Sequence, residues 1–177
     1  TLTGPLKLVV HTDASWGNVS DGQSKGGEFI SLAEDKDHSA AFCPVLWSSR
    51  RIRRAVRSTF GAETLSLVDG VENALVLRYL LDEVAGHVLT SPVNGRALPI
   101  GMVVTKGDTF PGIPLQAVVD CKSVFDHIGG NKTSVTEKRL MVDLANLRED
   151  LHRGALREVC WCVSANQLAD CLTKRMS

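Results

Sequence analysis

The sequence predicts an α/β protein with a five-stranded mixed sheet, three antiparallel strands followed by two parallel ones, flanked by helices. Strand-like segments come first, a long stretch with helical periodicity follows, and strand and helix patterns then alternate to the end. A chain of 177 residues can bury one core but is short for two ordinary domains, so we expect a single domain over residues 1–177.

The first three strands are predicted near the N-terminus. An apolar run over residues 6–13 ends in Asp13, and a polar loop over residues 17–27 separates it from two further candidates at 27–33 and 39–48. Such closely spaced strands are typical of an antiparallel meander.

A long helix is predicted next, over residues 59–85, because apolar side chains recur there at helical spacing until Gly86. Residues 87–112 are rich in Pro and Gly, and we interpret them as a surface insertion. An apolar run over residues 115–119 then predicts a fourth strand that ends at Asp120.

The C-terminal third alternates again. A short helix is predicted over residues 123–128, and a second one carries a leucine stripe from Leu140 to Leu151. A fifth strand is predicted over residues 156–163, joined in parallel to the fourth through a crossover.

Two segments have capping-box spacing, Ser134 to Glu137 and Ser164 to Gln167. The second predicts that the last helix begins at about residue 165.

Composition excludes several classes. The formal net charge is zero, so bulk charge does not indicate a nucleic-acid binder, and no apolar run approaches the roughly 20 residues that span a bilayer. The five cysteines have no repeated metal-ligand spacing, which favours reduced thiols and a reducing compartment. Cys160 and Cys162 are better explained as neighbours on one strand face than as zinc ligands.

Four acidic residues fall at the ends or first turns of separate predicted elements: Asp13, Glu63, Asp120 and Asp170. Taken singly, each is more readily explained as an exposed acid. Gathered in one place, they would repel one another unless cations lay between them. Hard divalent cations prefer oxygen ligands, and a pair of them can clamp a phosphodiester.

The start of the long helix supports a free role for Glu63. With Ser58 or Thr59 as N-cap, the capping-box position falls at Gly61 or Ala62, so the Glu63 carboxylate is not needed to satisfy the helix end. By the same argument, Gln167 would cap the last helix and leave Asp170 available.

Five arginines precede Glu63 within eight residues: Arg50, Arg51, Arg53, Arg54 and Arg57. A solvated basic face is the simpler interpretation. Their concentration beside a candidate phosphodiesterase site, in a chain without net charge, favours phosphate contacts.

Six segments share a pattern with a known family: residues 11–16, 46–51, 58–63, 119–123, 136–139 and 166–174. In their order and spacing, over nearly the whole chain, they resemble the ribonuclease H domain of copia-type (LTR) retrotransposon polyproteins, which is associated with reverse transcriptase. The resemblance implies a ribonuclease H-like fold and an endonuclease that hydrolyses the RNA strand of RNA/DNA hybrids, leaving a 5′-phosphate. Since the chain lacks an initiator Met, we expect a fragment of such a polyprotein.

The resemblance also implies roles for the acidic residues. Asp13 would bridge two Mg²⁺ ions, for which Mn²⁺ can substitute, and Asp170 would complete the ion that holds the attacking water. Glu63 and Asp120 would hold the ion that faces the leaving oxygen.

The resemblance also implies how the RNA/DNA hybrid would be bound. The shape of the hybrid and its 2′-hydroxyls, rather than its bases, would be recognised. Beyond the arginines, the implied nucleic-acid-binding residues are Ala14, Ser15, Trp16, Ser123, Lys138, Arg139 and Asn166. Trp16 and Trp47 suit a packing role at least as well.

Implied partners are the hybrid and the reverse transcriptase domain of the same polyprotein, without a membrane, in a cytoplasmic particle or the nucleus. One departure from cellular ribonucleases H is the missing His before the last helix, where Val163 runs directly into Ser164. Two alternatives stay open: a catalytically silent hybrid-binding module, and a DNA-cutting nuclease of the same superfamily.

Overall fold

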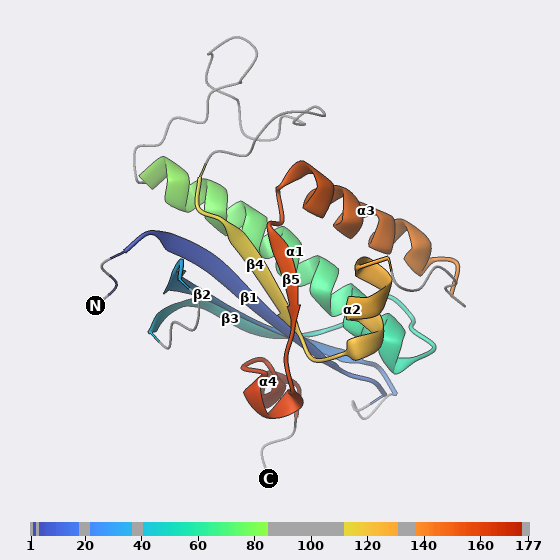
Figure 1. The fold of residues 1–177 in the computed structure, drawn as a ribbon. Helices are drawn as coiled ribbons and strands as arrows, with labels where there is room; N and C mark the ends of the chain where they lie inside the picture. The colour runs from blue at the N-terminus through green and yellow to red at the C-terminus, as the bar shows by residue number, and fades with distance from the viewer. Residues whose placement is uncertain are drawn as a thin grey trace.

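The computed structural model describes residues 2, 4–17, 22–36, 41–84, 112–130 and 137–174. They form a five-stranded sheet of order β3-β2-β1-β4-β5 with helices on both faces (Figure 1). Its strands are β1 (Leu6–Ser15), β2 (Lys25–Glu34), β3 (Phe42–Arg51), β4 (Leu115–Val119) and β5 (Glu158–Trp161). The first three pair antiparallel, while β1 with β4 and β4 with β5 pair in parallel, which confirms the predicted fold class.

The helices divide between the two faces of the sheet. One face carries α1 (Thr59–Val84), α2 (Lys122–Ile128) and α3 (Leu140–Arg153), and their apolar side chains share one core with alternate residues of β1 and β4. The short α4 (Asp170–Thr173) packs on the opposite face, over β1 and β2. Two faces with different coverings follow from the alternation of side chains along each strand.

Two glycines set the distance between the sheet and these helices. A Cβ added at Gly70 of α1 would lie 2.4 Å from Thr12 Cγ2, so α1 can approach β1 only without a side chain there. A Cβ at Gly27 of β2 would lie 2.9 Å from Thr173 Cγ2 and 3.1 Å from the Ala169 carbonyl oxygen. Glycine at these two positions lets helices from both sides approach the strands closely.

Most predicted elements lie close to their expected positions. The helix predicted over residues 59–85 ends at Val84, and the leucine stripe forms α3, which ends at Arg153 and is followed by Gly154 as a left-handed C-cap with φ of 75°. The strands predicted at 27–33 and 39–48 extend over Lys25–Glu34 and Phe42–Arg51.

The predicted start of the last helix is wrong. A 3-10 turn covers Ser164–Asn166 without a side-chain cap, and α4 begins only at Asp170. Gln167, assigned above to a capping box, is instead buried beneath this segment.

Other expectations lie wholly or partly outside the described residues. The proposed insertion at 87–112 is described only at Gly112, and Ser134 of the first capping box is not described.

Cys160 and Cys162 both pack against the apolar patch of Val9, Ala33 and Val118, as expected for one strand face. In the described parts of the chain, we find no helix with the length and hydropathy needed to cross a bilayer.

Candidate active site

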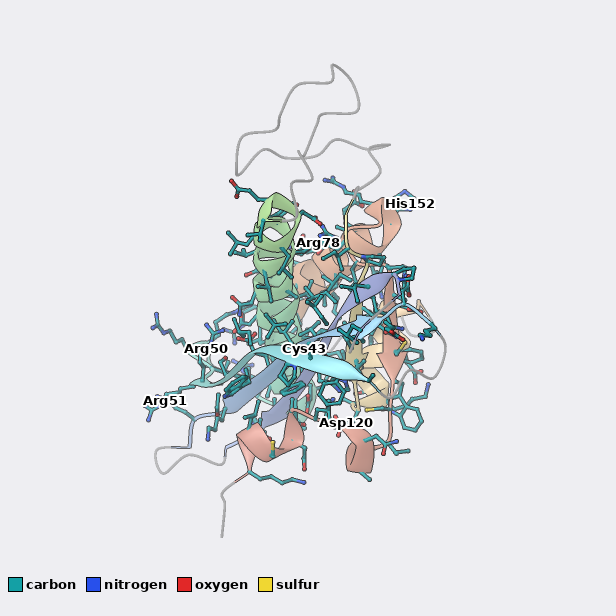
Figure 2. All side chains as sticks on the ribbon, turned by 90° about the vertical axis from the view of Figure 1, so that its left-hand side faces the viewer. Cys43, Arg50, Arg51, Arg78, Asp120 and His152 are labelled. Carbon is teal, nitrogen blue, oxygen red and sulfur yellow. The ribbon has the colours of Figure 1, made fainter. Side chains whose placement is uncertain are left out.

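Two acidic residues meet because β1 and β4 run in parallel. His11 lies opposite Val118, and Asp13 and Asp120 each follow two residues later, so their side chains leave the sheet at the same end. Asp120 lies there beside the short helical segments near the C-terminus (Figure 2). Parallel neighbouring strands are about 4.8 Å apart, which brings the two carboxylates within reach of one cation.

Glu63 reaches the same end of the sheet from the first turns of α1. One carboxylate oxygen each from Asp13, Glu63 and Asp120 lies within 4.8 Å of the others. Asp13 and Glu63 are buried, with 6% and 7% of their surface exposed, and Asp120 is half-buried. This acidic triad is the candidate metal site.

The N-terminus of α1 is held by residues other than Glu63. Ser58 Oγ accepts a hydrogen bond from the Gly61 amide at 3.1 Å, as expected for an N-cap. The same hydroxyl donates to Glu137 Oε1 at 2.5 Å. The Glu137 carboxylate therefore supports the start of α1, while its backbone carbonyl oxygen accepts from the Leu140 amide at the start of α3. Glu63 is not needed at the helix end and is available to the triad.

Hydroxyl groups orient the two aspartates. Thr173 Oγ1 of α4 donates a short hydrogen bond to Asp13 Oδ2, and Ser164 Oγ donates to Asp120 Oδ2 at 2.7 Å. The indole Nε1 of Trp161 donates to the Asp120 carbonyl oxygen at 2.8 Å. These contacts fix the carboxylates from the side of the sheet that α4 covers.

Asp170 lies outside the 4.8 Å group, at the first residue of α4. Its Oδ2 pairs with Lys174 Nζ at 2.6 Å. Its charge nevertheless contributes to raising the pKa of both Asp13 and Glu63, so it lies close to them. The structure thus brings three of the four predicted acids together and places the fourth at the margin.

Burial and mutual repulsion govern the electrostatics of the triad. Burial, followed by the charges of Asp13 and Asp120, raises the pKa of Glu63 to about 9. Burial also raises the pKa of Asp13, although the Thr173 hydroxyl opposes this. Buried carboxylates repel one another when they are all ionised, and a divalent cation between them would offset this repulsion. Their oxygen atoms are ligands that hard cations such as Mg²⁺ or Mn²⁺ prefer.

The arginine run is only partly available for phosphates. Arg50 pairs with the buried Glu28 of β2, and Arg54 pairs with Asp143 of α3 at 3.1 Å. Arg51, which together with Arg50 projects from the sheet edge in Figure 2, is exposed, as are Arg53 and Arg57.

The remaining residues predicted to contact nucleic acid have varied environments. Ala14 is buried, and its amide partly offsets the raised pKa of Asp13 and Glu63, whereas Trp16 is half-exposed. Ser15 is half-buried, and Ser123 lies 3.2 Å from Cys121 Sγ. The exposed ones are Lys138, Arg139 and Asn166.

Sequence reasoning missed four residues that shape this site: Ser164, Gln167, Thr173 and Lys174. Three of them lie in the segment 166–174 that carries the family resemblance, which was the available signal. The roles of Ser164, Gln167 and Thr173 depend on contacts with residues more than 40 positions away, and local spacing does not indicate such contacts.

No protein-family model and no curated protein sequence matches the chain. Its fold is similar to that of several solved structures. The N-terminal RNase H domain of Rv2228c from Mycobacterium tuberculosis, solved as a fusion with maltose-binding protein, is 16% identical with a TM-score of 0.53, covering 95% of this chain and 91% of that one.

Two further structures give the same result. LC11 RNase H1, solved in complex with an RNA/DNA hybrid, is 15% identical with a TM-score of 0.52, covering 94% of this chain and 93% of that one. The PFV RNase H domain is 14% identical with a TM-score of 0.50, covering 96% and 93%. The chain therefore has the ribonuclease H fold.

Proposed function

We propose that this chain is a metal-dependent ribonuclease H, an endonuclease that hydrolyses the RNA strand of RNA/DNA hybrids and leaves a 5′-phosphate. The observation that carries the proposal is the convergence of Asp13, Glu63 and Asp120 at one end of a sheet with this fold. A protein with the same fold, LC11 RNase H1, has been solved with such a hybrid.

The triad and Asp170 would hold two Mg²⁺ ions, with Mn²⁺ as a substitute. When bound, these ions supply Lewis-acid stabilisation of the charge that develops during phosphodiester hydrolysis. Oxygen donors alone, two of them buried and with raised pKa values, fit hard cations rather than zinc.

The protein's own groups would orient and protect the reacting centre. Thr173 donates a hydrogen bond to Asp13 and Ser164 donates one to Asp120, and these bonds restrain the two carboxylates. Burial of Asp13 and Glu63 limits access of bulk water, which strengthens electrostatic interactions there. Asp170 would join the site by exchanging its Lys174 contact for a cation.

Substrate phosphates would be bound along the neighbouring sheet edge. Gly27 of β2 pairs with Asp13 on β1 and with Ser49 on β3, so Ser49 lies level with Asp13 across the sheet. Arg51, Arg53 and Arg57 come shortly after Ser49 along the chain. Their positive charge can attract a hybrid backbone without reading its sequence.

We also propose, from the family resemblance, that the domain acts in a copia-type retrotransposon together with the reverse transcriptase of the same polyprotein. Such action would take place in a cytoplasmic particle or the nucleus.

A cleavage assay tests the function. Labelled RNA/DNA hybrid, duplex RNA, duplex DNA and branched DNA would be incubated with the protein in EDTA, Mg²⁺ or Mn²⁺. Metal-dependent cutting of the RNA strand in the hybrid is expected. Cutting of DNA would instead indicate a DNA nuclease of the same fold, and hybrid binding without cutting would indicate a silent binding module.

A further inference from the structure

Gln167 has an environment that no capping role explains. It lies between the 3-10 turn and α4, and only 5% of its surface is exposed. Its amide nitrogen donates to the Thr12 carbonyl oxygen at 3.0 Å and to the Val118 carbonyl oxygen at 3.4 Å. Its amide oxygen lies 3.0 Å from His11 Nδ1 and accepts from the Ala169 amide at 3.4 Å.

The four contacts reach the chain next to three acidic residues. Thr12 immediately precedes Asp13, Val118 lies two positions before Asp120, and Ala169 immediately precedes Asp170. We propose that Gln167 is a positioning residue, whose amide joins these three backbone segments and so fixes the placement of the acids relative to one another. This inference rests on the proposed function, because it concerns the assembly of the same metal site.

Only a primary amide of this length satisfies all the contacts. Two carbonyl oxygens require a donor, which orients Nε2 towards the strands and leaves the oxygen facing the Ala169 amide and His11. The Nδ1 of His11 must then carry a proton and donate. A glutamate would place negative oxygens against two carbonyl groups, and an apolar side chain would offer no donor.

The segment that carries Asp170 has few other anchors. A helix of four residues is not stable by itself, because nucleation is unfavourable and few hydrogen bonds repay it. Its other anchors are the close approach at Gly27, the hydroxyl of Thr173, and Ser49 Oγ of β3, which donates to the Leu172 carbonyl oxygen at 2.5 Å. Among these anchors, the buried Gln167 amide is the one that joins the start of α4 to both β1 and β4.

The chain offers a matched control. Gln116 of β4 is half-buried in the groove that also contains His11 and Val118, with a volume of about 230 Å³. Its Nε2 donates to Cys160 Sγ at 2.9 Å and reaches none of the three acid-bearing segments by a described hydrogen bond. Replacing this glutamine removes an amide from the same sheet without removing the proposed connection.

The test compares Gln167→Met, close in size but without donors, with Gln116→Met and the wild type. Mn²⁺ affinity would be measured by electron paramagnetic resonance titration, stability by thermal melting in EDTA, and kcat and KM with the hybrid. Gln167→Met should bind Mn²⁺ at least roughly tenfold more weakly and lose kcat with little change in KM, since losses of this size follow removal of groups that orient metal ligands. Gln116→Met should bind Mn²⁺ like the wild type.

Gln167→Glu gives a second variant if Gln167→Met does not fold, and it should also bind Mn²⁺ more weakly. Wild-type Mn²⁺ affinity in a folded Gln167 variant would overturn the inference while leaving the proposed function intact. Failure of both variants to fold would also overturn it, since Gln167 would then support the fold as a whole. If the wild type itself bound no Mn²⁺ and cut no hybrid, the proposed function would fail, and this inference with it.

Discussion

The two parts of the candidate site are built in different ways. Asp13 lies on a strand of 10 residues, and Glu63 lies on a helix of 26 residues. Asp120 directly follows a strand of 5 residues, and all three elements pack on the main core. Asp170 belongs to a helix of 4 residues on the other face, held by side-chain contacts and one close approach. The acidic triad is therefore positioned by the fold itself, whereas Asp170 is positioned by a few specific contacts, and mutations should separate the two.

The largest effect is expected from Asp13→Asn. Losing this carboxylate should reduce hybrid cleavage by at least about 10³-fold, because several kcal/mol of charge stabilisation would depend on the cations that we propose it holds. The melting temperature in EDTA should stay equal or rise, since burial and like charges raise the pKa of Asp13 and its ionised form is unfavourable there.

Cleavage assays and thermal melts in EDTA measure both quantities. Glu149→Gln, which changes an exposed acid on α3, is a suitable control and should leave cleavage unaltered. A large fall in melting temperature for Asp13→Asn would argue against electrostatic strain in the triad.

A pair of glycine substitutions compares the two parts directly. Gly70→Ala would force α1 away from Thr12 and should lower the free energy of unfolding by about 1–3 kcal/mol. Gly27→Ala would press on Thr173 and Ala169, so it should weaken Mn²⁺ binding and cleavage more than it lowers stability.

Urea unfolding and Mn²⁺ titration of both variants check this contrast. If each variant lost stability and Mn²⁺ affinity in the same proportion, the distinction between the two parts of the site would not hold.

The third prediction concerns pH. Because the pKa of Glu63 rises from 4.5 to about 9 on folding, the folded state holds one more proton than the unfolded state between these values. The contribution of Glu63 to stability in EDTA should therefore fall as pH rises through this window, by up to about 1.4 kcal/mol per pH unit.

Denaturant unfolding at several pH values in EDTA measures this slope. Glu63→Gln should flatten it, and Mg²⁺ should protect the wild type at high pH because the cation replaces the proton. A wild-type profile with no slope would mean that Glu63 is not desolvated.

The smallest effect is expected from the arginines. Arg53→Ala with Arg57→Ala should reduce the salt dependence of hybrid binding by roughly one to two units of slope, since each phosphate contact releases about one counterion. Arg50→Ala with Arg54→Ala should change that slope less and stability more, because both side chains already pair with acids.

Fluorescence anisotropy at several salt concentrations, in the Asp13→Asn background, measures the slopes without cleavage. Equal slopes for the wild type and the Arg53 and Arg57 variant would assign these arginines to a solvated face.

Local patterns were sufficient to predict the elements of the fold. Apolar runs that end in Asp13 and Asp120 predicted β1 and β4, and helical spacing predicted α1 and α3. These patterns report which side of an element is buried, and burial dominates the choice of secondary structure.

The errors arose where distant groups compete with local ones. Ser164 has capping-box spacing, yet its hydroxyl binds Asp120, 44 positions away. Gln167 contacts His11 across 156 positions, and Arg54 pairs with Asp143 across 89. No local spacing distinguishes a capping residue from one that finds a better partner elsewhere in the fold.

The pairing of β1 with β4 also determines which changes this protein can tolerate over evolutionary time. Asp13 and Asp120 each lie two residues after the paired residues His11 and Val118, so the pairing of the two strands fixes their relative position. Amino-acid replacements that keep this pairing leave the positions of the two aspartates unchanged, whereas loss or gain of one residue within β1 would turn Asp13 to the wrong face. Insertions and deletions should therefore be far rarer than substitutions in these two strands among descendants that keep the activity.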